Sequence, residues 1–335
     1  MMSDSSRRIR MRVTGLLAGA TLLTAAGCGT GAEGSTGSGG TEGGRPEITA
    51  AMYPLQWLAE QVGGSDATVT GLTKPGVEPH DLELSPQVVA GLESTSLVVY
   101  IKGVQPAVDE AVEQHAADRG FDAATMVTTL PAGQGQGHEE EGGHAGEPGD
   151  GHGDEAGDEH GDEHGVSYDP HLWLDPSRFA TVATKLGEKL AAADPAHAQG
   201  YKDRAAKLSA DLTALDKELA SGLANCGSDA MVTSHEAFGY LANRYGLHQI
   251  GISVDPDAEP SPARLAEVSE VAKREKVTTI FTETLVSPKV AEVLAQEVGA
   301  TTAVLDPIES QPATGDYLSA MRQNLTTLKA ALSCS

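Results

Sequence analysis

Basic residues are scarce in this sequence: 23 Lys and Arg stand against 48 Asp and Glu, and the net charge is -25. Such an excess of negative charge argues against nucleic acid and anionic membrane surfaces as partners, because both carry charge of the same sign. It is compatible with the binding of cations. The 335 residues suffice for two domains of ordinary size, and a hydrophobic content of 39% can supply a sizeable core.

Long hydrophobic runs are also lacking. The apolar run over residues 13–26 follows four arginines and has the length of a signal peptide, too short for a membrane span. It ends in Ala25-Ala26-Gly27-Cys28, and small residues before a cysteine resemble a bacterial lipobox. We therefore predict a signal peptide over residues 1–27 and lipidation of Cys28. A flexible Gly/Ser-rich tether over residues 28–46 would then hold the folded protein at the extracytoplasmic face of the cell membrane.

Cysteine is the third scarce feature, with three in the chain. If Cys28 carries a lipid, Cys226 and Cys334 remain, and an oxidising compartment would allow them to form one disulfide bond. That bond would tie the C-terminus to the start of the second half of the chain. Two unpaired thiols are the alternative.

Short apolar runs alternate with helical patterns through most of the chain, and this predicts an α/β fold. Strands are expected over residues 48–52, 67–72, 97–101, 126–130, 230–234, 248–254, 277–282 and 301–305. Helices are expected over residues 55–62, 86–92, 106–117, 177–192, 236–245, 262–276, 288–298 and 316–332. The alternation indicates two lobes, each with a mainly parallel sheet that is flanked by helices.

A long helix is predicted between the two lobes. It should begin at Pro195 and end at about Gly222, because an apolar stripe recurs there at helical spacing. At 1.5 Å per residue it would be roughly 40 Å long and could join the lobes rigidly. We therefore divide the chain into an N-terminal lobe over residues 47–194, a linking helix over 195–222 and a C-terminal lobe over 223–335.

One tract interrupts the first lobe. Residues 133–165 combine many glycines with eleven acidic residues and with five histidines: His138, His144, His152, His160 and His164. This composition cannot bury a core and is predicted to be disordered. The histidines are expected to act as auxiliary, low-affinity metal ligands. A purely solubilising acidic loop is the alternative.

Three other histidines occupy stiffer positions. His80 lies in a turn-rich segment after the second expected strand. His171 stands between a proline and a Leu-Trp-Leu run, directly before a predicted helix start at Asp175-Pro176. His235 follows the strand over residues 230–234. A single histidine in such a place is more often a satisfied core residue than a ligand, so the interpretation depends on whether the three converge.

Two acids, Glu283 and Asp306, also follow expected strands. Ligands of open α/β sheets bind at the carboxyl ends of the strands, so these acids and the three histidines could meet in a cleft between the lobes. Three imidazoles and one carboxylate suit Zn²⁺, with Mn²⁺ possible as the carboxylate content rises.

Four motifs resemble those of the zinc/manganese substrate-binding lipoproteins of bacterial ABC importers: Val77-Glu-Pro-His80-Asp, Asp169-Pro-His171-Leu-Trp-Leu-Asp-Pro, Thr233-Ser-His235-Glu-Ala-Phe-Gly-Tyr-Leu and Leu305-Asp306-Pro. The resemblance covers essentially the whole chain after the tether and includes the histidine-rich tract. It implies metal in the cleft between two lobes, capture of Zn²⁺ outside the cytoplasm, and delivery to an ABC permease and its ATPase by a monomer.

The resemblance also implies the ligands. Carried over by position, they are His80, His171, His235 and Asp306, with Glu283 supporting a ligand or serving as an alternative fourth one. A histidine rather than a carboxylate at position 235 favours zinc over manganese. Where some zinc-specific members have a glutamate directly before the first histidine, this chain has Pro79, which cannot ligate.

Several other functions compete with zinc import. A manganese-specific member of the same family, and a surface adhesin or zinc buffer, would share the motifs. A zinc hydrolase would need an open coordination position and a general base. A fourth protein ligand would close the site, and the chain has no H-E-x-x-H motif. The sequence therefore predicts a binding protein and not an enzyme.

Overall fold

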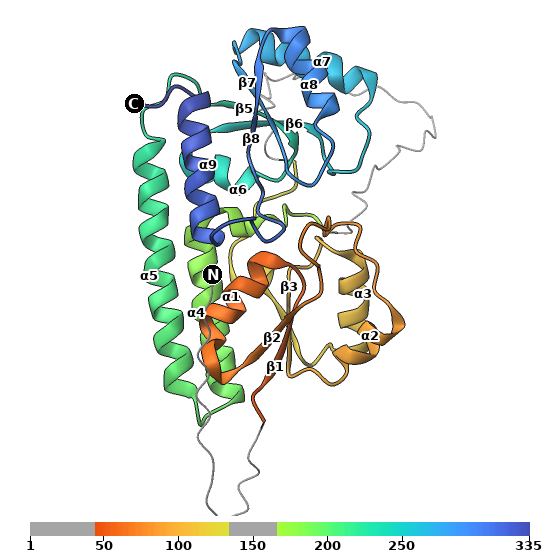
Figure 1. The fold of residues 1–335 in the computed structure, drawn as a ribbon, viewed down its shortest axis with the longest axis vertical. Coiled ribbons are helices and arrows are strands. Elements are labelled where there is room, and N and C mark those ends of the chain that lie inside the picture. The colour runs from red at the N-terminus through yellow and green to blue at the C-terminus, as the bar shows by residue number, and fades with distance from the viewer. Residues whose placement is uncertain (1–43, 134–165) are drawn as a thin grey trace, which may run out of the picture. The chain divides into compact units, whose positions relative to one another are not determined.

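Two four-stranded parallel sheets, one from each half of the chain, organise the protein (Figure 1). The computed structural model describes residues 44–133 and 166–335. The first sheet has the order β2-β1-β3-β4 and consists of β1 (Glu47–Ala50), β2 (Thr68–Gly71), β3 (Leu97–Tyr100) and β4 (Gly120–Asp122). The second has the order β6-β5-β7-β8 and consists of β5 (Ala230–His235), β6 (His248–Ser253), β7 (Thr279–Thr282) and β8 (Thr301–Val304).

Both sheets follow the same path. The chain begins on an inner strand, adds an edge strand on one side and then crosses to the other side of the first strand. Ile48 of β1, for example, is opposite Val69 of β2 and Leu97 of β3. The change of direction creates a switch point between β1 and β3, and another between β5 and β7, where ligand sites form in open α/β sheets. The predicted α/β fold with two lobes is confirmed.

Helices connect the strands and flank the sheets, as parallel pairing requires. In the first lobe they are α1 (Tyr53–Gly63), α2 (Pro86–Leu92) and α3 (Pro106–His115), and in the second they are α6 (Gly239–Tyr245), α7 (Pro262–Arg274), α8 (Lys289–Val298) and α9 (Tyr317–Ala331). The helix α4 (Pro176–Ala193) begins as predicted, because the Asp175 side chain accepts hydrogen bonds from the backbone N–H groups of Ser177 and Arg178.

One predicted strand is wrong. Residues 126–130 are not a strand, and the fourth strand of the first sheet is β4, which lies earlier in the chain. Asp122 explains the difference: its Oδ1 accepts the N–H of Ala124 at 3.0 Å, and its carbonyl accepts the hydroxyl of Thr125 at 2.7 Å. These bonds turn the chain into the 3-10 helix η2 (Ala123–Met126) directly after the strand.

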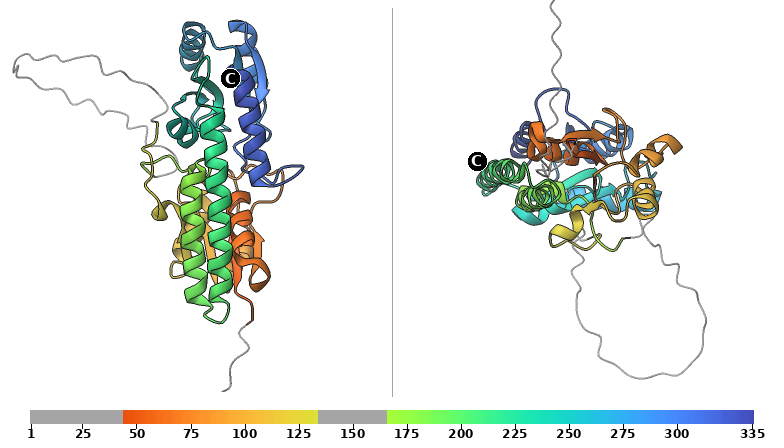
Figure 2. Two further views of the ribbon diagram at one scale, coloured as in Figure 1. Left: turned by 90° about the vertical axis from the view of Figure 1, so that its left-hand side faces the viewer. Right: turned by 90° about the horizontal axis from the view of Figure 1, so that it is seen from below.

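The helix α5 (Ala198–Gly222) contacts both lobes (Figure 2). Near its start, Arg204 donates to the carbonyls of Val62 and Gly63 in the first lobe, both at 2.8 Å. Near its end, Asp216 pairs with Arg244 of α6 at 2.8 Å, within the second lobe. The helix begins three residues later than predicted, because residues 195–197 form a turn before it.

A buried aromatic cluster joins the lobes further. Tyr317 of α9 stacks on Trp57 of α1 with 4.8 Å between ring centroids and lies 5.1 Å from Phe179 of α4. The hydroxyl of Tyr317 donates to the carbonyl of Trp173. The core is therefore continuous from one lobe to the other. Among the described residues, no helix combines the length and the apolar character needed to cross a bilayer.

The structure has a disulfide bond between Cys226 and Cys334, which are 108 residues apart. We expect Cys334→Ser to lower the free energy of unfolding by about 3 kcal/mol, because the unfolded chain loses a long covalent loop. Urea unfolding with and without reductant measures this. Reductant should destabilise the unsubstituted protein equally and leave Cys334→Ser unchanged, whereas two thiols that alkylate freely in the native protein would contradict the bond.

Candidate metal centre

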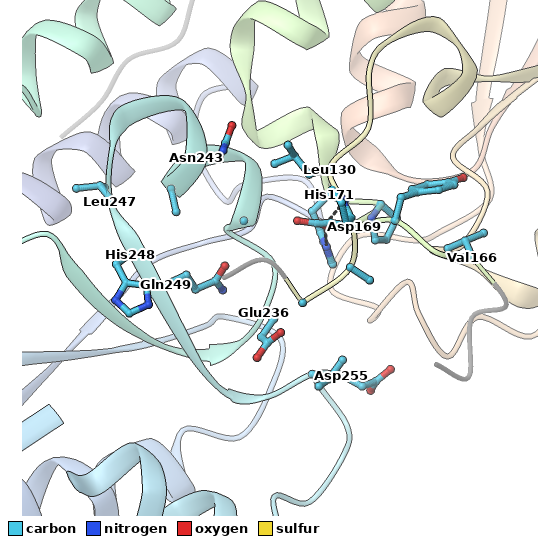
Figure 3. Close-up of a pocket in the computed structure, with 18 of the residues that line it drawn as sticks. Leu130, Val166, Asp169, His171, Glu236, Asn243, Leu247, His248, Gln249 and Asp255 are labelled. Carbon is cyan, nitrogen blue, oxygen red and sulfur yellow. Dashed lines mark hydrogen bonds and ion pairs between the residues drawn. The ribbon is translucent and has the colours of Figure 1, made fainter. Parts of the chain in front are cut away.

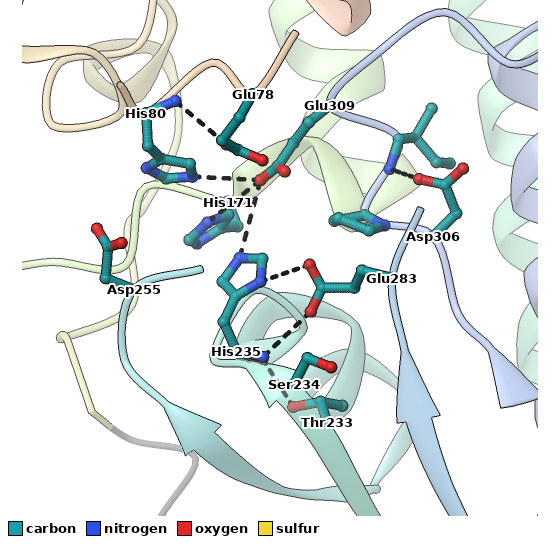
Figure 4. Close-up of polar contacts among 12 residues, drawn as sticks. Glu78, His80, His171, Thr233, Ser234, His235, Asp255, Glu283, Asp306 and Glu309 are labelled. Carbon is teal, nitrogen blue, oxygen red and sulfur yellow. Dashed lines mark hydrogen bonds and ion pairs between the residues drawn. The ribbon is translucent and has the colours of Figure 1, made fainter. Parts of the chain in front are cut away.

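Three histidines from distant parts of the chain converge between the lobes (Figure 4). His80 lies in the segment after β2, His171 directly precedes the 3-10 helix η3 (Leu172–Leu174), and His235 is the last residue of β5. The ring centroids are 5.6 Å apart for His80 and His171, 6.0 Å for His80 and His235, and 5.5 Å for His171 and His235. All three side chains are buried. The convergence that the sequence left open is therefore present.

Glu309, in the segment after β8, provides the fourth group. Its Oε1 lies 3.3 Å from Nε2 of His80 and 3.8 Å from Nε2 of both His171 and His235. One ligand atom from each of these four buried residues lies within 4.8 Å of the other three. Four donors this close, three nitrogens and one oxygen, can surround a single divalent ion.

The predicted fourth ligand, Asp306, lies outside this group, and Glu309 is the carboxylate that the structure places among the four donors. The Oδ1 of Asp306 instead accepts the backbone N–H of Ile308 at 2.7 Å. Ile308 has a φ of 61°, a left-handed conformation that is rare for a β-branched residue. Asp306 thus stabilises the turn that directs Glu309 into the site. The sequence signal for Glu309 was weak: this second acid lies four residues beyond the expected strand end, three residues after Asp306.

Carboxylates hold two of the histidines in one orientation. His171 Nδ1 lies 2.8 Å from Asp169 Oδ1, and His235 Nδ1 lies 2.7 Å from Glu283 Oε2. Because a carboxylate accepts hydrogen bonds, each Nδ1 carries a proton, and each Nε2 is the nitrogen that can bind a metal ion when it is deprotonated. Within the described part of the chain, both Nε2 atoms are buried without a hydrogen-bond partner. This is the arrangement of metal-ligating histidines, and it gives Glu283 the role of supporting His235.

Opposite charges perturb the acid–base groups of the site. Burial alone would raise the pKa of Glu309, but the hydrogen bond from His80 and the nearby histidines lower it to about 2. Burial alone would lower the pKa of His235, but Glu283 and Glu309 raise it to about 9. For His171 burial prevails and lowers the pKa. The carboxylate of Glu309 therefore stays ionised although it is buried, and its negative charge favours a cation at the centre of the site.

A cavity of about 330 Å³ adjoins the centre (Figure 3). His80 and His171 line it, together with residues of both lobes such as Tyr168 and Glu236. Gly133 and Val166 also line it, and these two residues bound the histidine-rich tract. The five histidines predicted as auxiliary ligands lie outside the described residues, as do the predicted signal peptide, Cys28 and the predicted tether up to residue 43.

Two parallel α/β lobes with a buried three-histidine, one-carboxylate group between them define a metal-binding protein of the two-lobed solute-binding class. The family model described as ZnuA, zinc-uptake complex component A periplasmic, matches residues 48–331. The chain belongs to this family, whose members are binding proteins and not enzymes.

Similar sequences and solved structures support this family assignment. The chain is 34% identical over 297 residues to the zinc-binding lipoprotein AdcA of Streptococcus pneumoniae, covering 85% of this chain and 56% of the relative. It therefore spans little more than half of that protein. The Zn(II)-bound ZnuA-like domain of AdcA from the same species is 31% identical with a TM-score of 0.68, covering 86% of this chain and 99% of that one. The laminin-binding protein Lmb of Streptococcus agalactiae, titled a bifunctional protein with adhesin and metal transporting activity, is 27% identical with a TM-score of 0.71, covering 86% and 99%.

Proposed function

We propose that this protein captures Zn²⁺ outside the cytoplasm with high affinity and delivers it to an ABC permease for import. The observation that carries the proposal is the group of four buried donors, His80, His171, His235 and Glu309, within 4.8 Å of one another. Nitrogen and carboxylate ligands in this number suit four-coordinate Zn²⁺. Four protein ligands fill the tetrahedral positions that Zn²⁺ prefers, which fits binding and release of the ion as cargo.

The proposals about membrane anchoring and about partners are supported by the sequence and by the relatives. Lipidation of Cys28 would hold the protein near the membrane, and a relative named as a zinc-binding lipoprotein supports this. The partners are the permease and its ATPase, and the protein acts as a monomer that docks on them.

Zinc uptake by intact cells tests delivery. Cells that lack this protein should take up little labelled zinc from depleted medium, and the full chain should restore uptake. His235→Ala should not restore it at the same protein level, because the ion loses a buried ligand. Full uptake with His235→Ala, or with the permease gene deleted, would overturn the proposal.

Surface attachment is a second candidate, because Lmb is described as having adhesin activity. Binding of the zinc-loaded full chain to immobilised laminin tests it. Saturable binding by this protein would support attachment, and binding no stronger than that of an unrelated acidic protein would exclude it.

For the tract over residues 134–165 we keep the prediction of auxiliary zinc collection. Both residues that bound the tract line the cavity beside His80 and His171, so the chain enters and leaves the tract next to the site. Deletion of the tract should leave one tight site, lower the total zinc bound and slow loading when zinc is scarce. Zinc stoichiometry and affinity of the two proteins measure this. Loss of the tight site would place a ligand in the tract, and unchanged stoichiometry would leave a solubilising loop.

A further inference from the structure

A second carboxylate, that of Glu78, stands beside the four-donor group. Figure 4 shows it next to Glu309 and His80, directed toward the centre. Its Oε1 accepts the backbone N–H of His80 at 3.2 Å, so the side chain is held in place. Its Oε2 is buried and has no hydrogen-bond partner among residues 44–133 and 166–335. Glu78 is not among the residues whose ligand atoms lie within 4.8 Å of one another.

This position is unfavourable in the absence of a cation. A buried carboxylate oxygen without a partner costs free energy, because it has left water and gained no hydrogen bond. A divalent ion among the four donors would place two positive charges near this carboxylate. The arrangement is therefore suited to the metal-loaded site.

We infer that Glu78 is a specificity-determining residue, whose Oε2 supplies a fifth ligand to divalent ions that prefer more oxygen ligands than Zn²⁺ does, such as Mn²⁺. The inference rests on the proposed function, because it concerns the same site. Zn²⁺ is satisfied by four ligands and does not need Glu78. Mn²⁺ prefers carboxylates and a higher coordination number, so it recruits the additional oxygen by a rotation of the side chain. Glu78 thus extends the range of ions that the protein accepts.

Competition titrations of the full chain with Zn²⁺ and with Mn²⁺ test this. Glu78→Gln keeps the size of the side chain and an acceptor for the His80 N–H, but it removes the charge and the strong oxygen donor. We expect it to lower Mn²⁺ affinity about tenfold or more and Zn²⁺ affinity less than threefold, in line with the usual effect of a supporting carboxylate. The matched control is Asp81→Asn, which removes the same charge from the exposed residue on the other side of His80.

Visible absorption of the Co²⁺-loaded proteins gives an independent measure of coordination number. The unsubstituted protein should show the weaker bands of a five-coordinate ion, and Glu78→Gln the stronger bands of a tetrahedral one. Equal loss of Zn²⁺ and Mn²⁺ affinity, an equal effect of Asp81→Asn, or unchanged spectra would each overturn the inference. Failure of the unsubstituted protein to bind Zn²⁺ tightly would instead overturn the proposed function, so the two failures are distinguishable.

Discussion

Replacement of His171 by alanine is expected to weaken Zn²⁺ binding by roughly three orders of magnitude, or about 4 kcal/mol. The ion loses one of four ligands, and residues 44–133 and 166–335 place no further histidine in the four-donor group. His171 Nε2 lies 3.8 Å from Glu309 Oε1, so its removal opens the centre of the group. Competition with a chromophoric zinc chelator measures the affinity.

The matched control is His197→Ala. His197 is an exposed histidine that precedes α5 and contacts Asp194 at 2.7 Å. Its replacement should leave zinc affinity unchanged. Thermal unfolding provides a second readout, because a ligand that binds only the folded state at 1,000 times its Kd adds about 4.1 kcal/mol. Zinc should raise the Tm of the control and, at the same concentration, scarcely that of His171→Ala. Tight binding by His171→Ala would refute the site.

Glu309→Gln should lower zinc affinity by about two to three orders of magnitude, because an amide oxygen is a much weaker ligand than a carboxylate. Asp306→Asn should lower it less than tenfold. The amide oxygen of asparagine can still accept the N–H of Ile308, which preserves the turn. The comparison decides directly between Glu309, which the structure groups with the three histidines, and Asp306, which the sequence predicted as the fourth ligand.

Isothermal competition titrations of both variants measure this difference, and circular dichroism checks that each is folded. A larger loss for Asp306→Asn than for Glu309→Gln would place Asp306 on the metal. Equal, small losses would mean that three histidines alone hold the ion.

Local patterns in the sequence determined the two-lobed fold. Helix periodicity, alternating apolar runs and the cap at Asp175 act over a few residues, so they can be interpreted without a partner segment. The same patterns placed His80, His171 and His235 at element ends, where an α/β sheet exposes side chains to a cleft. The strand expected over residues 126–130 failed because bonds from the Asp122 side chain and carbonyl prevailed over an apolar run.

Only the tertiary structure shows which carboxylate lies beside the three histidines. Asp306 and Glu309 follow the same strand three residues apart, and both are acids, so no local signal separates them. Which of the two acids reaches the histidines depends on the left-handed turn at Ile308 and on Trp173. The Nε1 of Trp173 donates to the carbonyl of Pro307 at 2.7 Å across 134 residues of sequence. The tertiary structure likewise sets the two histidine–carboxylate pairs. His171 Nδ1 lies 2.8 Å from Asp169, and His235 Nδ1 lies 2.7 Å from Glu283. Residue types suggest such contacts, but the path of the backbone makes them.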